Sequence, residues 1–317
     1  MISCSKTAPP TTATMVNYAQ PTATPEMKTW VQGERFCDFS ARAYHGVYVI
    51  KDRMYVTAGR GVSGCVSDTW YTVDCENWMT SSAKAGFAPR DSFGSAVFNN
   101  KMWVICGANK GNVFDDIYSS PDGVTWTASV ITQGFGGRAG LSAAVFKDSL
   151  YVSAGYDEKK EYNDIWSTKD GGKWVKVKDD SAAGFIKRSG HRMLVFANKL
   201  WIIGGRIDAD KYLSDVWTSE NGIDWKAATP NAGFTPRADF TGLVYKDRMW
   251  VMGGMGHKGA VNNEVWWSVN GYYWMSTTAK ADFGPGAGFG AAEYKGKIYL
   301  TGGVSGDKMK REIWAGQ

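Results

Sequence analysis

The chain has 317 residues and a formal net charge of +5, with 44% hydrophobic and 14% aromatic residues, which is enough apolar material for a packed core. No apolar run approaches the roughly 18 residues that a membrane-spanning helix needs, so none is expected. Lysine and arginine are spread along the chain rather than gathered into a basic stripe, which argues against a nucleic-acid partner. The five cysteines are too few and too irregular for a disulfide framework or a zinc site, and leave open only a single bridge between Cys37 and Cys65.

Residues 1–26 differ in composition from everything that follows. Residues 1–25 contain four of the nine prolines, six threonines and no acidic residue. Such a segment cannot bury enough apolar surface to order itself, so we expect a flexible tail or tether. The start, MISCS, resembles the end of a bacterial lipoprotein signal with Cys4 as the lipidated residue, although the basic and apolar regions of such a signal are absent. This favours a cell-envelope, periplasmic or extracellular location over a cytoplasmic one.

From residue 30 onward, a tryptophan, a phenylalanine and an arginine recur in the same order six times, except that Gly286 stands where the sixth arginine is expected. Successive tryptophans are 48 to 51 residues apart. A fixed period in this range means that one supersecondary unit is repeated and stacked on its neighbours. The series is Trp30, Phe39, Arg42; Trp78, Phe87, Arg90; Trp126, Phe135, Arg138; Trp174, Phe185, Arg188; Trp225, Phe234, Arg237; and Trp274, Phe283.

The unit at residues 188–225 shows the expected elements in chain order. Two short apolar runs, 193–196 and 200–203, are separated by a tight turn, which is typical of buried strands. The glycine pair Gly204-Gly205 permits close backbone approach where inner strands crowd an axis. Residues 215–218 form a third strand, and a fourth begins at the closing tryptophan.

The turn before that fourth strand is also repeated. Asn221-Gly222 predicts a type I′ hairpin turn, in which both central residues have positive φ. Cys75 stands where the first unit should have this glycine, and there it predicts a turn of another type.

The two ends of the chain complete one another. The last unit stops at residues 314–317, after its third strand, whereas residues 28–30 form a fourth strand with no unit before it. Pairing these two segments would complete the last sheet and leave no open edge. The sequence therefore predicts an all-β fold, a six-bladed β-propeller of four-stranded blades over residues 27–317, closed by its N-terminal strand.

The residue pattern of the repeat resembles the kelch motif of the galactose-oxidase-like propeller superfamily. The residues that carry the likeness are Arg188-Ser189-Gly190-His191, an apolar strand, Gly204-Gly205, Asp215-Val216-Trp217 and the closing Trp225. The likeness covers residues 28–317 and is weakest in the first and last units. The copper oxidases of this superfamily need histidines and a Tyr–Cys pair around one metal, and these cannot be assembled here. With no dinucleotide or phosphate-loop pattern either, we expect no metal and no cofactor.

The repeated arginines begin the first strand of each unit and should ring one mouth of the central channel. Arg60 and Arg206 follow the glycines that end the second strand and should lie on the same face. Kelch proteins that bind acidic peptides resemble this pattern, which implies that Arg60, Arg206, Arg42 and Arg188 face a ligand; Tyr156 and Met255 hold the corresponding post-glycine positions in other blades. The alternative is an internal ladder, in which each repeated arginine pairs with a repeated acid.

The loops on this face are short and uniform, which favours a binding surface over the long insertions that carry catalytic groups. The leading hypothesis is a non-catalytic propeller that binds a protein, an acidic peptide or an acidic sugar through its arginine-rich loop face. The alternative is an enzyme, a periplasmic mutarotase or epimerase for sugar acids of the sialic-acid type, which some six-bladed kelch proteins resemble in size and layout. Glu264 or Glu312, which replace the aspartate of the third strand, would then be the acid/base group.

Overall fold

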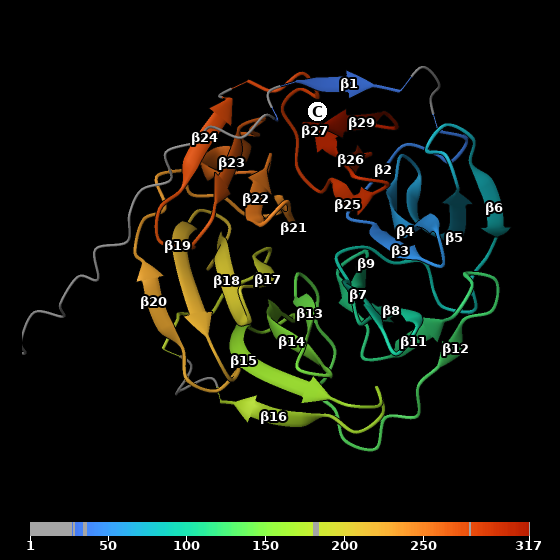
Figure 1. The fold of residues 1–317 in the computed structure, drawn as a ribbon. Helices are drawn as coiled ribbons and strands as arrows, with labels where there is room; N and C mark the ends of the chain where they lie inside the picture. The colour runs from blue at the N-terminus through green and yellow to red at the C-terminus, as the bar shows by residue number, and fades with distance from the viewer. Residues whose placement is uncertain (1–26, 28, 34–36, 180–183, 279, 317) are drawn as a thin grey trace, which may run out of the picture.

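The computed structural model describes residues 27, 29–33, 37–179, 184–278 and 280–316. Apart from two small two-stranded sheets, these ranges form six antiparallel sheets arranged around one axis, which confirms the six-bladed β-propeller (Figure 1). A single 3-10 turn, η1 (His257–Gly259), is the only helical element within them. The predicted tail, with Cys4, lies outside the described residues.

In each blade the strands follow one another from the channel outward. In blade one, β2 (Arg42–Ala43) and β3 (Gly46–Ile50) are innermost, followed by β4 (Arg53–Gly61), β5 (Gly64–Thr72) and β6 (Met79–Ser82). Blade two consists of β7 (Gly94–Phe98), β8 (Lys101–Ile105), β11 (Ile117–Ser120) and β12 (Thr127–Ala128). Blade three consists of β13 (Ser142–Phe146), β14 (Ser149–Tyr156), β15 (Glu161–Thr168) and β16 (Val175–Lys178).

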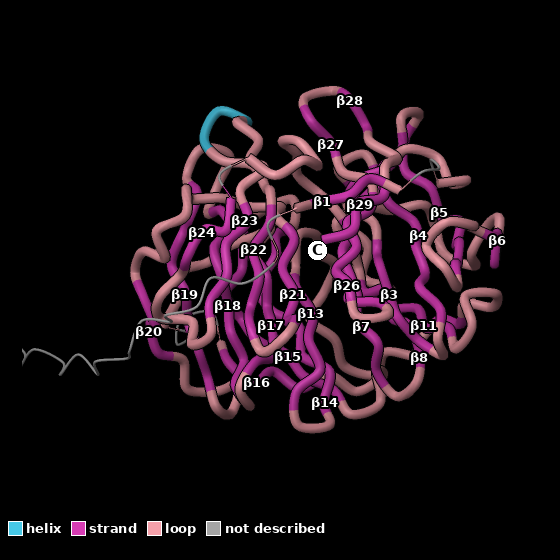
Figure 2. The backbone as a smooth tube through the Cα atoms, turned by 45° about the horizontal axis from the view of Figure 1, so that its top comes forward, coloured by secondary structure: helices cyan, strands magenta, loops and turns pink. Residues whose placement is uncertain are grey.

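The remaining blades repeat this order. Blade four consists of β17 (Arg192–Phe196), β18 (Lys199–Arg206), β19 (Tyr212–Ser219) and β20 (Lys226–Thr229). Blade five consists of β21 (Thr241–Tyr245), β22 (Arg248–Met252), β23 (Val265–Ser268) and β24 (Met275–Thr278). Two small hairpins, β9 (Ala108–Asn109) with β10 (Asn112–Val113) and β27 (Val304–Ser305) with β28 (Lys308–Met309), connect second to third strands. Figure 2 shows β27–β28 and η1 projecting on one face of the disc.

Blade six is built from both ends of the chain, as predicted. It contains β25 (Gly290–Tyr294), β26 (Lys297–Thr301) and β29 (Ile313–Gly316), and β1 (Trp30–Gln32) is its outermost strand. Trp30 pairs with Gly316 and Gln32 with Trp314, in antiparallel register. In Figure 1 the blue β1 lies beside the red β29, so the ring has no open edge at this point.

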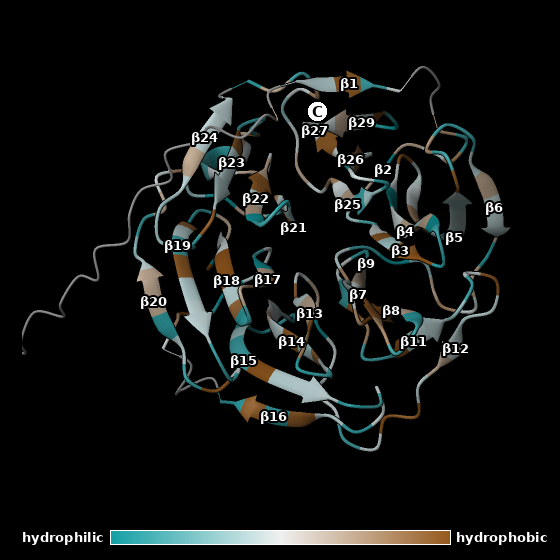
Figure 3. Cartoon of the chain, in the orientation of Figure 1, coloured by the Kyte–Doolittle hydropathy of each residue, from teal (hydrophilic) through white to brown (hydrophobic). Residues whose placement is uncertain are grey.

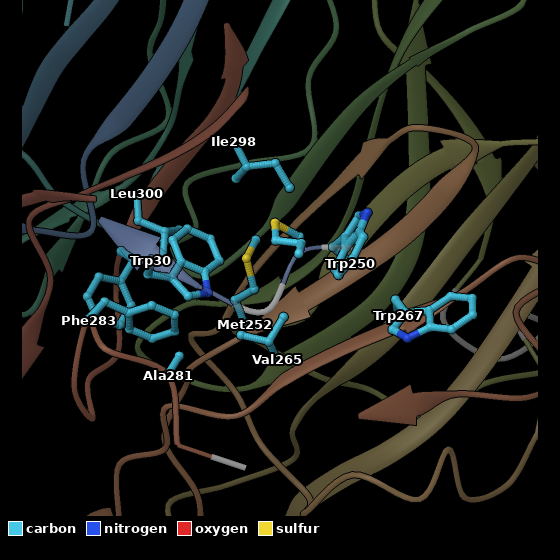
Figure 4. Packing of buried hydrophobic residues seen from close by; sticks show 11 residues of the cluster. Trp30, Trp250, Met252, Val265, Trp267, Ala281, Phe283, Ile298 and Leu300 are labelled. Atoms are coloured by element: carbon cyan, nitrogen blue, oxygen red, sulfur yellow. The ribbon is translucent and has the colours of Figure 1, made fainter. Parts of the chain in front are cut away.

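The hydrophobic core is divided into six clusters, one for each interface between neighbouring blades. The cluster between blades five and six contains Trp250 and Trp267 of one blade and Ile298 and Leu300 of the next (Figure 4). Figure 3 shows the apolar residues concentrated on inner and middle strands such as β8, β22 and β26.

The repeated tryptophans and phenylalanines meet edge to face. Each of six pairs has ring centroids 5.0–5.7 Å apart and planes inclined by 80–90°. This is the geometry that aromatic rings favour, and it places the repeated phenylalanines in the core rather than on a stacking platform. The pairs are Trp30–Phe283, Trp78–Phe39, Trp126–Phe87, Trp174–Phe135, Trp225–Phe185 and Trp274–Phe234.

The predicted type I′ turn at Asn221-Gly222 is wrong, because only the glycine has positive φ, 77°. Side chains shape this turn instead: Ser219 Oγ accepts the N–H groups of residues 221 and 222, and Asn221 Oδ1 accepts those of residues 223 and 224. The different turn predicted at Cys75 is also wrong, since Cys75 takes the glycine's left-handed conformation at φ 68° and keeps the same kind of hydrogen bonds. The type I′ pattern occurs in the inner hairpins, such as Lys51-Asp52.

Candidate functional site at the mouth of the central channel

The five repeated arginines, here called the blade arginines, lie inside the blades. Their exposed fractions are 0–2%. In blade one, Arg42 Nη1 and Nη2 donate to the two carboxylate oxygens of Asp68 at 2.7 and 2.8 Å, and Nη1 also donates to the Ala58 carbonyl at 3.0 Å. The other pairs are Arg90–Asp116, Arg138–Asp164, Arg188–Asp215 and Arg237–Glu264.

This arrangement corrects the assignment of Arg42 and Arg188 as ligand-facing residues. The third-strand acid of the same blade faces each guanidinium, and in blades one to four it accepts from two of its nitrogens, as Asp215 does from Arg188 at 2.8 Å. With no exposed surface, neither side chain can reach a ligand. The blade arginines therefore form the internal ladder.

Blade six lacks the arginine and fills its place differently. Lys310 reaches the loop that precedes β25. Its Nζ donates to the Phe283 carbonyl at 2.9 Å and lies 5.1 Å from the centre of the Phe289 ring. Burial lowers the pKa of Lys310, and Glu312 opposes that change. A lysine from the segment between β28 and β29 thus supplies the positive charge.

Arg60 and Arg206 lie at the mouth of the channel, as expected, and are accessible. Arg60 Nε donates to Asp91 Oδ2 at 2.8 Å, and its side chain is 49% exposed. Arg206 Nη1 lies 3.3 Å from Asp239 Oδ2, and its side chain is 25% exposed. Blades one and four are opposite one another in Figure 1, so two Arg–Asp pairs stand across the mouth.

Below this rim the channel contains a cavity of about 220 Å³. Its polar lining includes Tyr44, Ser92, Thr241, Asp239 and Arg192. Apolar residues such as Phe93, Leu141 and Phe289 complete the wall. The site is therefore a small polar cavity with arginines above it and within it.

Arg192 is the charged residue that the repeat does not explain. It begins β17, and the other five inner strands begin with a small residue: Gly46, Gly94, Ser142, Thr241 and Gly290. No hydrogen bond or ion pair joins its guanidinium to any residue that the structure describes. Burial lowers the pKa of Arg192, and the Asp239 carboxylate acts in the opposite direction. An arginine held in a cavity without a partner is ready to receive an anion.

The Asp239 carboxylate interacts electrostatically with Arg206, Arg192 and Arg60. Burial raises the pKa of Asp239, and the charges of Arg206, Arg192 and Arg60 counteract this. Tyr44 lies beneath Arg60, whose guanidinium is 5.1 Å from the Tyr44 ring centre. Burial and then Asp239 raise the pKa of the Tyr44 hydroxyl, so it remains a neutral donor.

The other predicted site residues are placed as follows. Tyr156 pairs with Ala139 beside the mouth, and burial raises its pKa while Arg206 lowers it. Met255 holds the same position in blade five, paired with Ala238. Glu264 is bound to Arg237 and accepts a hydrogen bond from Trp266 Nε1 at 3.1 Å, and Glu312 accepts the Arg311 N–H at 3.1 Å. Neither glutamate lines the cavity, so the structure does not bring the two acid/base candidates to it.

The histidines and cysteines at this end have structural partners. His45 Nε2 is 2.8 Å from Thr301 Oγ1, and His191 Nε2 is 2.7 Å from Ser153 Oγ. Cys37 and Cys65 are free thiols, directed to the Arg311 carbonyl and to Asp91 respectively. Within the described ranges, no three His, Cys, Asp or Glu side chains are grouped as a metal site would require.

No model of a protein family and no curated protein matches the chain. The solved structure of YjhT is similar to it, with a TM-score of 0.72 and 17% sequence identity over 88% of this chain and 95% of that one. At this identity the likeness concerns the fold alone. No helix of the described ranges is long and apolar enough to cross a membrane. The chain is thus a six-bladed β-propeller whose mouth combines two Arg–Asp pairs with one arginine that has no partner among the described residues.

Proposed function

We propose that the protein binds a small monoanionic ligand of the sugar-acid class at the mouth of its channel. The observation that carries this proposal is Arg192, which lines the cavity and forms no ion pair with any residue of the described ranges. Arg60 and Arg206 are matched by Asp91 and Asp239, which leaves one positive charge when both acids are ionised. One carboxylate would neutralise it, and the guanidinium fork fits a carboxylate with two parallel hydrogen bonds.

The size and lining of the cavity favour a small polyhydroxylated molecule. Its volume of about 220 Å³ lies below the roughly 300–1,000 Å³ of sites for drug-sized ligands. Hydroxyl-bearing residues surround Arg192, among them Tyr44, Ser92 and Thr241. An acidic peptide would reach Arg192 only by inserting one side-chain carboxylate, so a peptide or protein partner is the broader alternative. Membership of the kelch family and a cell-envelope location stay predictions.

Binding of sugar acids to the wild type and to Arg192→Gln tests this function. We expect calorimetry to detect a sugar acid but not its neutral parent sugar. The variant should lose about 10- to 150-fold in affinity, the range for a hydrogen bond to a charged group. Arg53→Gln, at an exposed arginine that stacks on Tyr71 away from the cavity, is the matched control and should bind normally. Equal affinities for the acid and the neutral sugar, or an unchanged affinity in Arg192→Gln, would refute the proposal. Binding of acidic peptides but of no sugar acid would show that the ligand is a peptide.

A second candidate function is anomer exchange on the same ligand. Asp239 favours it, because burial raises the pKa of a carboxyl group that lines the cavity beside Arg206. Opening the sugar ring requires a base that removes the anomeric hydroxyl proton and an acid that protonates the ring oxygen. Exchange spectroscopy on a sugar acid should then show faster interconversion of its anomers with the wild type than with Asp239→Asn. Equal rates for the two proteins, both with the ligand bound, would mean that the protein binds the sugar acid without catalysing exchange of its anomers.

A further inference from the structure

A closed ring of six backbone hydrogen bonds joins the six blades at the channel mouth. Each bond runs from the N–H of the second residue after the blade-arginine position to the carbonyl of its counterpart in the preceding blade, at 2.8–3.3 Å. All six residues have left-handed backbones, with φ between 55° and 64°. The six are Tyr44, Ser92, Gly140, Gly190, Asp239 and Gly288.

This backbone conformation suits glycine and is unfavourable for the other three residues. A side chain at positive φ meets the neighbouring carbonyl, and a bulky residue such as Tyr44 is a clear outlier there. Glycine closes the ring equally well in blades three, four and six, so the ring itself does not require Tyr44, Ser92 or Asp239. Strained residues of this kind cluster at functional sites, where the role of the side chain explains why the unfavourable backbone conformation is retained.

The three glycines make room for side chains at the mouth. A Cβ atom on Gly288 would lie 3.1 Å from the Tyr44 ring, and one on Gly190 would lie 2.6 Å from Asp239 Oδ1. Gly140 lies likewise beneath Tyr156, at 3.0 Å. The three glycines and the three side chains of the ring are therefore one arrangement that positions polar groups over the cavity.

Each of the three side chains keeps hydrogen-bonding capacity for a ligand. The Tyr44 hydroxyl and Asp239 Oδ1 have no hydrogen-bond partner in the described part of the chain. Ser92 Oγ donates to Asp91 Oδ1 at 2.8 Å, and its oxygen is left to accept a hydrogen bond. All three residues line the cavity that contains Arg192.

We infer that Tyr44, Ser92 and Asp239 are the specificity residues of the channel site, which recognise the hydroxyl groups of a polyhydroxylated anion while Arg192 holds its carboxylate. This inference rests on the proposed function and adds how the ligand is selected. Tyr44 supplies a donor, Ser92 an acceptor and Asp239 a charged acceptor, so a ligand that lacks the matching hydroxyls leaves these groups unpaired and binds less tightly.

Two measurements on the same variants test the inference. Tyr44→Phe and Ser92→Gly should each lower the affinity for the sugar acid by about 2- to 12-fold, the range for one neutral hydrogen bond. Tyr44→Phe should leave unchanged the affinity for the deoxy analogue that lacks the recognised hydroxyl. In urea unfolding, Ser92→Gly should be at least as stable as the wild type, because it relieves the left-handed serine. Gly140→Ser, the reverse change at an equivalent ring position, should be less stable.

The outcomes separate the inference from the proposed function. If the wild type binds a sugar acid and the Tyr44 and Ser92 variants bind it and its deoxy analogues with unchanged affinities, the inference is overturned and the function stands. Loss of stability in Ser92→Gly equal to that in Gly140→Ser would also overturn it, because Ser92 would then be a scaffold residue. A wild type that binds no sugar acid would overturn both.

Discussion

Two sets of arginines in this propeller have opposite relations to their surroundings. The five blade arginines are buried, occur at the same place in every blade but the last, and have acids of their own blade as partners. Arg60, Arg192 and Arg206 occur only in blades one and four and lie at or below the open mouth of the channel. In a repeat protein, residues that recur in register serve the scaffold, whereas charged residues that depart from the repeat indicate the site.

The largest expected effect separates the two sets by stability. Arg138 and Asp164 form the most buried pair, with side chains 2% and 4% exposed. Arg138→Met leaves Asp164 as an uncompensated buried charge and should cost about 3–5 kcal/mol of unfolding free energy. Arg192→Met removes a half-buried charge that has no ion-pair partner in the described part of the chain, so the free energy of unfolding should be unchanged or higher. Urea unfolding of both variants measures the difference, and equal losses would abolish the distinction.

The next effect concerns pH and should arise in the scaffold alone. Burial, and then Arg42, lower the pKa of His45 to about 3, and burial lowers that of His191 well below 6.5. The unfolded chain, with ordinary histidines, therefore binds more protons than the folded protein below about pH 6.5. The free energy of unfolding should therefore decrease as the pH drops below about 6.5, by up to about 1.4 kcal/mol per pH unit for each histidine.

Urea midpoints at pH 7 and pH 5 measure this slope. A His45→Gln/His191→Gln variant should show a smaller fall than the wild type, and the exposed His257→Gln should behave like the wild type. An unchanged slope in the double variant would assign the acid sensitivity to other groups.

The smallest effect tests blade six, where Lys310 takes the place of the missing arginine. Because Lys310 is only half-buried and makes hydrogen bonds to carbonyls, Lys310→Met should cost about 1 kcal/mol. Lys310→Arg should retain most of that stability in the same urea assay. A loss as large as that of Arg138→Met would show that Lys310 belongs fully to the ladder.

The sequence predicted the fold because the fold depends on local, repeated signals. The period of the tryptophans, the apolar runs and the unfinished last unit led to six blades and to the pairing of β1 with β29. The turn at Asn221-Gly222 was assigned to the wrong type because hydrogen bonds from Ser219 and Asn221 side chains shape it, and the dipeptide alone does not reveal them.

The site was predicted less completely. Arg60 and Arg206 lie at the mouth as expected, but Arg42 and Arg188 belong to the internal ladder, which the sequence had left open as the alternative. The arginine alone does not show which way it points, whereas the acid 26 residues after Arg42, Asp68, is a signal that it points inward. Arg192 was missed. Alignment of β3, β7, β13, β17, β21 and β25 by their first residues reveals it, because Arg192 is the one charged residue at a position where the other five strands have a small residue.

The pairing of β1 with β29 makes closure of the ring the last step in the assembly of the propeller during synthesis on the ribosome. Blades one to five contain only consecutive residues, so each can form as soon as its own segment has emerged. Blade six needs β1 and β29 together, so the ring closes only after β29 has left the ribosome. Until then the apolar faces of blades one and five that blade six will cover stay open to water. The chain that has not yet added β29 is therefore the species most prone to aggregation, and the one for which binding by a chaperone would matter most.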